Sequence, residues 1–165
     1  MHLVHAPLSS FNPALPEVAV QVDRQKLAKR LWRMAADDGM EFGFEVKTPM
    51  RHGDVVWADE KARYVIHQTP EPVLEIPLDV TPDAAAVIGW AVGNLHFAIE
   101  AQSTRLLAPD DTGLRQALDR LGIHYHEAIE VFQPHRFAGS FTGHGHSHGH
   151  EPHHHDHAHG HGHHH

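Results

Sequence analysis

The residues with the most evident chemistry lie at the end of the chain, where 13 of the last 22 residues are histidine. No aliphatic residue there is larger than Ala158, so burial cannot offset the entropy of ordering this stretch. Neutral imidazole binds nickel, zinc and copper(II), and histidine-rich tracts are typical of metal binding. We therefore predict a disordered tail, residues 139–165, that collects several metal ions. Its expected ligands are His144, His146, His148, His150, His153, His154, His155, His157, His159, His161 and His163. The alternative is an artificial purification tag. Tags are usually unbroken blocks of histidine, whereas other residues interrupt this run.

Four histidines outside the tail are further candidate metal ligands. His96 follows the end of a predicted helix, and His124 and His126 are two residues apart on a predicted strand. Alternate residues of a strand point to the same face, so this spacing can supply two ligands. His135 lies at the base of the tail and could anchor tail-bound metal near the fold. For each of these histidines a structural or solvated role is the alternative.

Composition excludes several classes of function. The chain has 21 acidic and 13 basic residues, a net charge of −8 with histidine neutral, which argues against nucleic acid or an anionic membrane as a partner. It has no cysteine, so disulfides and thiolate metal sites are excluded. The start resembles no signal peptide, and the longest apolar run, residues 84–92, is too short to span a bilayer. We expect a cytoplasmic location.

Templates for catalysis are weak. The stretch His126–Glu130 lacks the second histidine of a His-Glu-x-x-His zinc site, and there is no Gly-x-x-x-x-Gly-Lys phosphate loop. A catalytic metal needs a pre-organised pocket, which a disordered tail cannot supply. The sequence therefore predicts a metal-binding protein that is not an enzyme.

The elements that must position these histidines begin with short strands. Strands are predicted over 18–22, 41–46, 55–58 and 64–67, so residues 1–70 form a small β-rich domain. Residues 28–35 are ambiguous. Leu27, Leu31 and Met34 have helical spacing with Asp23 as N-cap, whereas the turn signal at 37–39 favours a hairpin strand. His52 and His67 are expected to be a turn residue and a strand residue.

A different pattern follows a rigid connector at residues 70–72, a natural domain boundary. We predict a strand over 73–78, then a helix with Thr81 as N-cap that ends near residues 93–94. A β pair over 97–101 and 104–107, a helix from 109–112 to Gly122, and a strand over 123–131 complete the order βαββαβ. This order is the ferredoxin-like arrangement, with both helices on one face of an antiparallel sheet. The fold class is α+β, with 71–138 as the second domain.

These features together resemble the urease accessory protein UreE family of nickel metallochaperones. The resemblance covers essentially the whole chain and is carried by the Gly93-Asn94-Leu95-His96 motif, the turn at 37–39, Gly43, the turn at 53–54 and the histidine-rich end. It implies that residues 1–70 are a peptide-binding-like domain, and it favours strand for residues 30–36. It also implies that residues 71–138 bind metal and that His96 is a nickel ligand at a homodimer interface, where two copies face one ion.

The resemblance further implies delivery of Ni²⁺, through a urease accessory GTPase, to apo-urease. Zn²⁺ and Cu²⁺ are alternative ions in vitro, and a metal-linked tetramer is an alternative to the dimer. The chain departs from relatives that carry histidines just before the second helix, because Asp110 and its neighbours occupy that position here. The competing function is nickel or zinc storage, in which the fold merely carries the tail.

Overall fold

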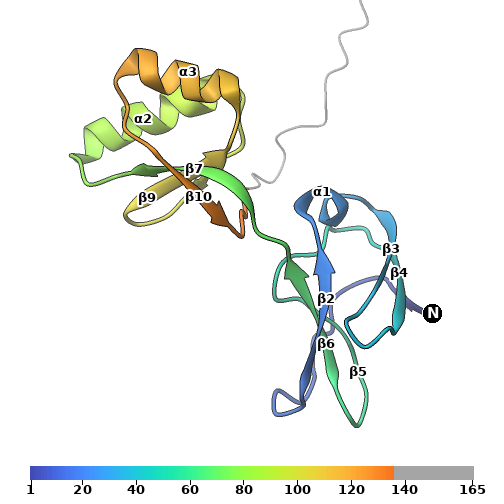
Figure 1. Ribbon diagram of the computed structural model, residues 1–165. Helices are drawn as coiled ribbons and strands as arrows, with labels where there is room; N and C mark the ends of the chain where they lie inside the picture. Colours follow the sequence, from blue (N-terminus) through green and yellow to red (C-terminus); the bar gives the residue numbers. More distant parts are fainter. Residues whose placement is uncertain (136–165) are drawn as a thin grey trace, which may run out of the picture. The chain divides into compact units, whose positions relative to one another are not determined.

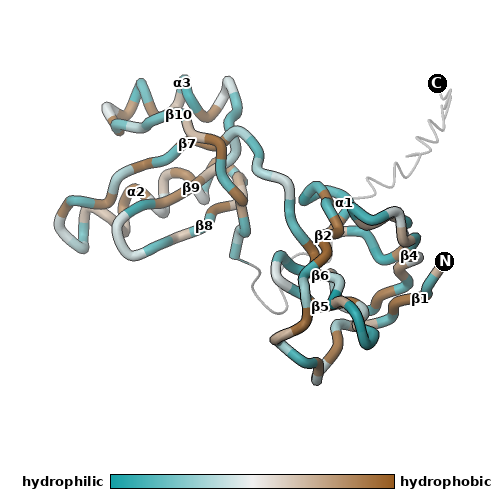
Figure 2. The backbone as a smooth tube through the Cα atoms, turned by 60° about the horizontal axis from the view of Figure 1, so that its bottom comes forward, coloured by the Kyte–Doolittle hydropathy of each residue, from teal (hydrophilic) through white to brown (hydrophobic). Residues whose placement is uncertain are grey.

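Six short strands and one short helix are the regular elements of residues 1–70 in the computed structural model, which describes residues 1–135 (Figure 1). Their bounds are His2–Val4 for β1, Glu17–Val22 for β2, Leu31–Ala35 for β3, Glu41–Glu45 for β4, Val55–Ala58 for β5 and Arg63–Gln68 for β6. They form two three-stranded sheets, in the orders β1-β4-β3 and β2-β6-β5. Hydrophobic stretches recur along these strands, as Figure 2 shows. This part is the β-rich structure that the sequence predicted.

The ambiguous stretch after residue 22 contains a short helix followed by a strand. Helix α1, Arg24–Leu27, begins after Asp23, whose side chain accepts a hydrogen bond from the Lys26 N–H at 2.7 Å. From Leu31 onward the chain is strand β3, paired antiparallel with β4. Strand is therefore correct for residues 31–35, because alternate side chains such as Trp32 enter the core while their neighbours face solvent.

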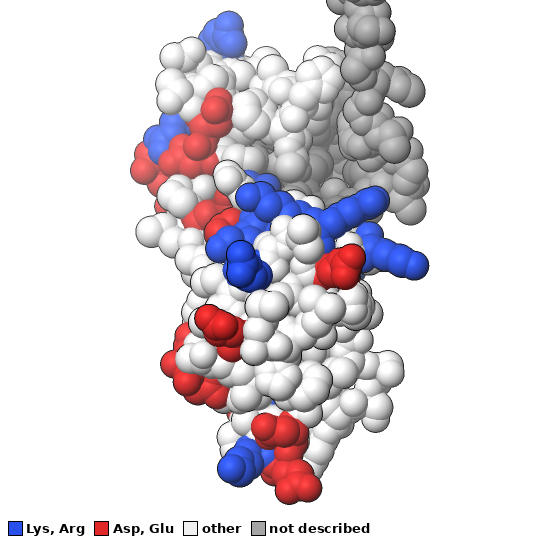
Figure 3. All heavy atoms as spheres, turned by 90° about the vertical axis from the view of Figure 1, so that its right-hand side faces the viewer, with Lys and Arg blue, Asp and Glu red and all other residues white. Residues whose placement is uncertain are grey.

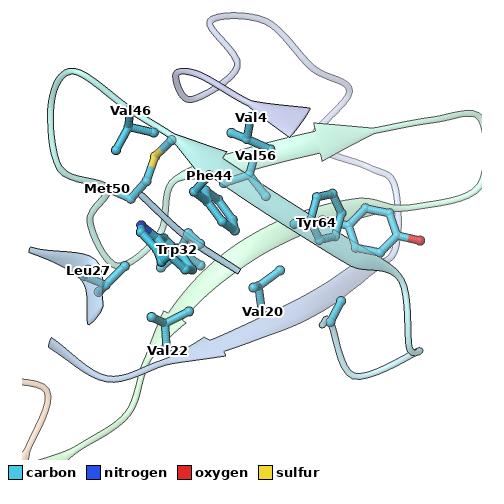
Figure 4. Close-up of a cluster of buried hydrophobic side chains, with 13 residues drawn as sticks. Val4, Val20, Val22, Leu27, Trp32, Phe44, Val46, Met50, Val56 and Tyr64 are labelled. Atoms are coloured by element: carbon cyan, nitrogen blue, oxygen red, sulfur yellow. The ribbon is translucent and has the colours of Figure 1, made fainter. Parts of the chain in front are cut away.

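The core of this part joins both sheets and α1 (Figure 4). Trp32 stacks on Phe44 with ring centroids 3.6 Å apart and planes within 7°. Val20 and Val22 from β2 and Leu27 from α1 are buried in the same cluster. Each such side chain contributes about 1.5–3 kcal/mol when fully buried, so this cluster holds the six strands in one unit.

The hairpin between β3 and β4 turns at Gly39, which has φ of +87°. Beside it, the Tyr64 hydroxyl donates a 2.8 Å hydrogen bond to the Asp38 carboxylate. This hydrogen bond, together with burial, raises the pKa of Tyr64 to about 12. The turn predicted at residues 37–39 is therefore confirmed, and a side chain from β6 fixes it.

Residues 71–135 form an antiparallel sheet with two helices. The bounds are Glu71–Pro77 for β7, Pro82–Asn94 for α2, Glu100–Ala101 for β8, Arg105–Pro109 for β9, Thr112–Leu121 for α3 and His126–Glu130 for β10. The strand order is β10-β7-β9-β8, and every pairing is antiparallel. Buried side chains from β7 and β9 pack with Val92 of α2 and with Leu114 and Leu118 of α3. The element order is βαββαβ, as the sequence predicted.

Several predicted boundaries were wrong. Residues 70–72 were predicted to be a rigid connector, but Glu71 and Pro72 already belong to β7. Pro72 is tolerated there because the register with β9 ends at Val73, so no ladder bond needs its missing N–H. The start of helix α3 at Thr112 lies within the predicted start at residues 109–112, but β10 begins at His126 rather than at Ile123.

In the described part of the chain, no helix is long and apolar enough to cross a membrane. The predicted disordered tail lies outside the described residues. The domain boundaries predicted at residues 70 and 138 stay predictions.

Candidate metal centre

His96 lies just beyond the C-terminal end of α2. The helix ends at Asn94, and the His96 N–H then donates a 2.9 Å hydrogen bond to the Gly93 carbonyl. His96 has φ of +63° and is the only non-glycine residue among residues 1–135 with a positive φ. That left-handed conformation costs an L-residue roughly 1–2 kcal/mol, and it normally favours glycine. The side chain is exposed, so no core packing explains why histidine stands here.

The position suits a cation. The last carbonyl groups of a helix have no intrahelical partner, and the helix dipole places partial negative charge at this end. An exposed neutral imidazole in the same place adds a nitrogen ligand for a divalent ion. The surroundings of His96 therefore suit metal binding, but one imidazole alone is a weak site.

An apolar groove of about 730 Å³ adjoins this helix end. Its lining includes Val87 and Trp90 of α2, Leu95 just before His96, and Leu121 of α3. Val87, Trp90 and Leu121 are 63%, 69% and 59% exposed. A cluster of exposed apolar side chains of this kind is typical of an interaction site.

The two histidines near β10 do not share a strand as predicted. His126 is the first residue of β10, and His124 lies in the segment before it. Both are exposed, and they alternate with Ile123 and Tyr125, which pack against the core. Because only His126 belongs to the strand, strand geometry does not make the two histidines a pair of ligands. Both side chains remain exposed to solvent.

His135 contacts the edge of the sheet. Its Nε2 atom lies 3.0 Å from the Ala101 backbone nitrogen and 3.2 Å from the Ala101 oxygen. The backbone N–H of His135 donates a 2.9 Å hydrogen bond to the Ile99 carbonyl. The ring is therefore held by backbone groups of β8.

The side chain of Asp110 is paired with an arginine. Arg115 contacts both carboxylate oxygens of Asp110, at 2.6 and 2.7 Å, and also reaches Glu127. The Arg115 hydrogen bonds lower the pKa of Asp110. A carboxylate held in this way is a poor candidate for a further metal site.

His52 and His67 approach each other, which the sequence did not predict. Their ring centroids are 5.5 Å apart, although one residue lies in a turn and the other in β6. His52 Nδ1 accepts a hydrogen bond from the Gln68 N–H at 3.1 Å, and His67 Nε2 lies 2.6 Å from Glu17. The His52 lone pair is thus engaged, and the His67 contact lowers the pKa of Glu17. We assign both histidines a structural role.

No cluster of three or more histidine, aspartate or glutamate side chains in residues 1–135 is arranged to hold a metal. His96, His124, His126 and His135 are therefore not brought together within the described part of one chain. The tail histidines lie outside the described residues.

Charge is unevenly distributed along the chain. Residues 1–70 contain nine acidic and nine basic residues, whereas residues 71–135 contain ten acidic and three basic. Lysine and arginine side chains gather in one area of the face seen in Figure 3. The segment that carries His96 is thus strongly acidic, which favours the approach of cations.

Comparison with known proteins places these features in a family. Residues 71–165 match the C-terminal domain of the UreE urease accessory protein. The chain is 31% identical over 144 residues to the urease accessory protein UreE of Beijerinckia indica, covering 84% of this chain and 81% of that protein. It is 30% identical over 135 residues to that of Geobacillus kaustophilus, covering 80% and 89%. The relative from Lysinibacillus sphaericus is 29% identical over 126 residues, covering 73% and 82%.

These relatives are accessory proteins by name, and none of the three is named for a catalytic activity. The chain belongs to the urease accessory protein UreE family, which implies a role in urease maturation.

Proposed function

We propose that this chain is a nickel metallochaperone that binds Ni²⁺ and delivers it for assembly of the urease active site. In this proposal it is a cytoplasmic transfer protein rather than an enzyme. It acts as a homodimer, with a urease accessory GTPase and apo-urease as its partners. Nickel is its cargo, and zinc or copper(II) compete for the same imidazoles in vitro.

The observation that carries the proposal is His96, exposed in a left-handed conformation at the end of α2 and beside an apolar groove. If two copies associate through this groove, a two-fold axis brings two His96 rings towards one ion. Two imidazoles leave coordination positions open. The tail, His124 or His126 can fill them, and ligands from a partner can then replace these by exchange.

Acid should release the metal. Imidazole binds metal only when it is neutral, and the ordinary histidine pKa is about 6.5. Metal bound by histidines is therefore lost as the pH falls below about 6. Delivery through His96 and storage in the tail share this behaviour, so pH alone does not separate them.

Calorimetric nickel titration of three proteins tests the proposal. They are the full chain, a chain that ends at Thr142, and the same truncated chain with His96→Ala. We expect the truncated chain to keep about one tightly bound ion per dimer, because two imidazoles can chelate one ion, and His96→Ala to remove it. If the truncated chain binds nickel only weakly and His96→Ala changes nothing, delivery through His96 is wrong.

The alternative is nickel or zinc storage by the tail. It is favoured by the 13 histidines of the tail and by the lack of a three-ligand cluster in residues 1–135. Storage predicts that all tight binding disappears with residues 143–165. It also predicts that His96→Ala leaves urease activation unchanged, whereas delivery predicts its loss.

A further inference from the structure

Leu31 lies on an exposed surface of the sheet β1-β4-β3. It is 74% exposed on β3, and Leu3 of β1 is 56% exposed on the same face. The register sets Leu3 and Arg33 on either side of Gly43, the middle residue of β4. Gly43 has no side chain, and a hollow of about 370 Å³ lies here, lined by Leu3, Leu31 and Arg33 among others. Two exposed leucines thus border one hollow on the side of the sheet that faces away from the core.

A second hollow, of about 780 Å³, shares Leu31 with the first. Arg30 and Lys47 both line it. The Arg30 carbonyl accepts a 2.8 Å hydrogen bond from the Val46 N–H, so the chain places Lys47 next to Arg30. Cationic side chains therefore lie on both sides of Leu31.

The cations of this surface have no role inside the fold. Arg30, Arg33 and Lys47 are exposed, and within residues 1–135 none of them has a carboxylate partner within 4.0 Å. Four other arginines do have such partners, namely Arg24, Arg63, Arg105 and Arg115. Unpaired cations beside exposed apolar side chains are typical of a surface that binds an acidic partner.

We propose that the basic surface, formed by Leu3, Arg30, Leu31, Arg33 and Lys47, binds an acidic segment of a partner protein. The segment carries an apolar side chain that packs against Leu3 and Leu31, and its carboxylates pair with the surrounding cations. This inference uses neither His96 nor a metal, so it goes beyond the proposed function.

Charge and symmetry argue against other anionic occupants. The net charge of −8 repels nucleic acid and anionic membranes at long range, and the carboxylate residue Glu45 also lines the second hollow. A second copy of the chain could offer its acidic residues 71–135. Such a contact joins two different surfaces, however, and it produces open filaments unless the rotation closes a ring. An acidic partner protein needs neither condition.

Fluorescence anisotropy of the full chain with a short labelled peptide tests the proposal. In this peptide, glutamates flank a single leucine, and a chelator in the buffer removes metal. Lys47→Glu should weaken peptide binding about fivefold, because an attraction becomes a repulsion. Lys61→Glu makes the same change between β5 and β6, outside both hollows, and should stay within about twofold of the parent chain. Equal losses in both variants would mean that only the net charge matters, and the proposal would be wrong.

Leu31→Ser tests the apolar part of the surface. It should weaken binding about fivefold, because a partly buried leucine contact is lost. Ile129→Ser is the matched control, since Ile129 is 75% exposed on β10, and it should leave the affinity unchanged. Binding that responds to Lys47→Glu but not to Leu31→Ser would be charge attraction without an apolar anchor and would overturn the proposal.

Two further probes, phosphatidylserine vesicles and single-stranded RNA, test the class of partner. If either binds the chain more tightly than the peptide and loses affinity in Lys47→Glu, the surface serves lipid or nucleic acid and the proposal is wrong. A parent chain that does not bind the peptide overturns it as well. Because metal is absent throughout, these failures leave the nickel role of His96 untouched, and that role fails separately in the nickel titration.

Discussion

His96 combines an unfavourable backbone conformation with an exposed side chain. Its φ of +63° lies in the region where glycine has no steric penalty, and nothing in its burial offsets the strain. Strain that the fold maintains without a packing benefit is typical of functional positions. The residue therefore indicates a role for the imidazole itself.

Two substitutions at this position should separate strain from metal binding. His96→Gly should be more stable than His96→Ala by about 1 kcal/mol, because alanine keeps the left-handed penalty and glycine does not. Both should lose the tight nickel site equally. Denaturant unfolding in the presence of a chelator measures the first effect, and nickel titration measures the second. Equal stability of the two variants would show that the left-handed backbone at position 96 is not strained.

At the scale of elements, the two helices of residues 71–135 begin differently. Asp111 accepts hydrogen bonds from the N–H groups of Gly113 and Leu114, at 2.7 and 3.1 Å. Thr81 has the extended conformation of an N-cap, but its side chain accepts no such bond. The sequence predicted Thr81 as a cap from residue type, and only the geometry shows that its side chain does not act as one.

Asp111→Ala should therefore destabilise the protein by about 1 kcal/mol, the usual cost of a lost N-cap. Thr81→Ala is the matched control and should cost clearly less, because no cap hydrogen bond is lost. Thermal and denaturant unfolding of the two variants at neutral pH provide the comparison. Equal losses would show that the Asp111 hydrogen bonds contribute nothing to stability.

Sequence patterns predicted which elements form better than where they end. Alternation around Phe42 and Phe44 indicated a strand correctly because both rings enter the core. Strand β10 begins three residues after its predicted start at Ile123, and the reason lies in the neighbouring strand β7. Extending the register of β10 with β7 would set His124 opposite Pro77, which has no N–H to donate.

Contacts between distant residues were not predictable from local spacing. The approach of His52 to His67 and the contact of His135 with Ala101 join residues 15 and 34 positions apart in the chain. Such contacts depend on sheet order and on the path of the chain after β10. The sequence motif therefore predicted His96 as a candidate metal ligand, but no sequence pattern predicted the groove beside it.

At the scale of the whole molecule, the groove along α2 and α3 is the proposed dimer interface. Trp90 is 69% exposed and lines it, whereas Ile129 is 75% exposed on β10 and does not. Trp90→Arg should shift the protein to monomers, because the buried charge would lack a partner. Ile129→Arg, an equally exposed apolar residue, should leave the dimer intact. Sedimentation of the metal-free proteins measures both.

Loss of the dimer should also weaken the tight nickel site in Trp90→Arg, although His96 itself is unchanged. A tight site that survives in a monomer would show that one chain supplies the whole shell. Dimers that persist in Trp90→Arg would place the interface elsewhere.

The left-handed backbone at His96 also has a consequence for sequence drift. Most substitutions that relieve strain are tolerated by a fold, and a position drifts towards them once selection on function is relaxed. If His96 binds metal as proposed, a descendant of this chain without that role would gain stability by replacing His96 with glycine. The same descendant would keep Gly39 and Gly53, whose φ values of +87° already suit their turns. Under the proposed function, histidine at this position thus marks retained metal binding, whereas the turn glycines reflect only the fold.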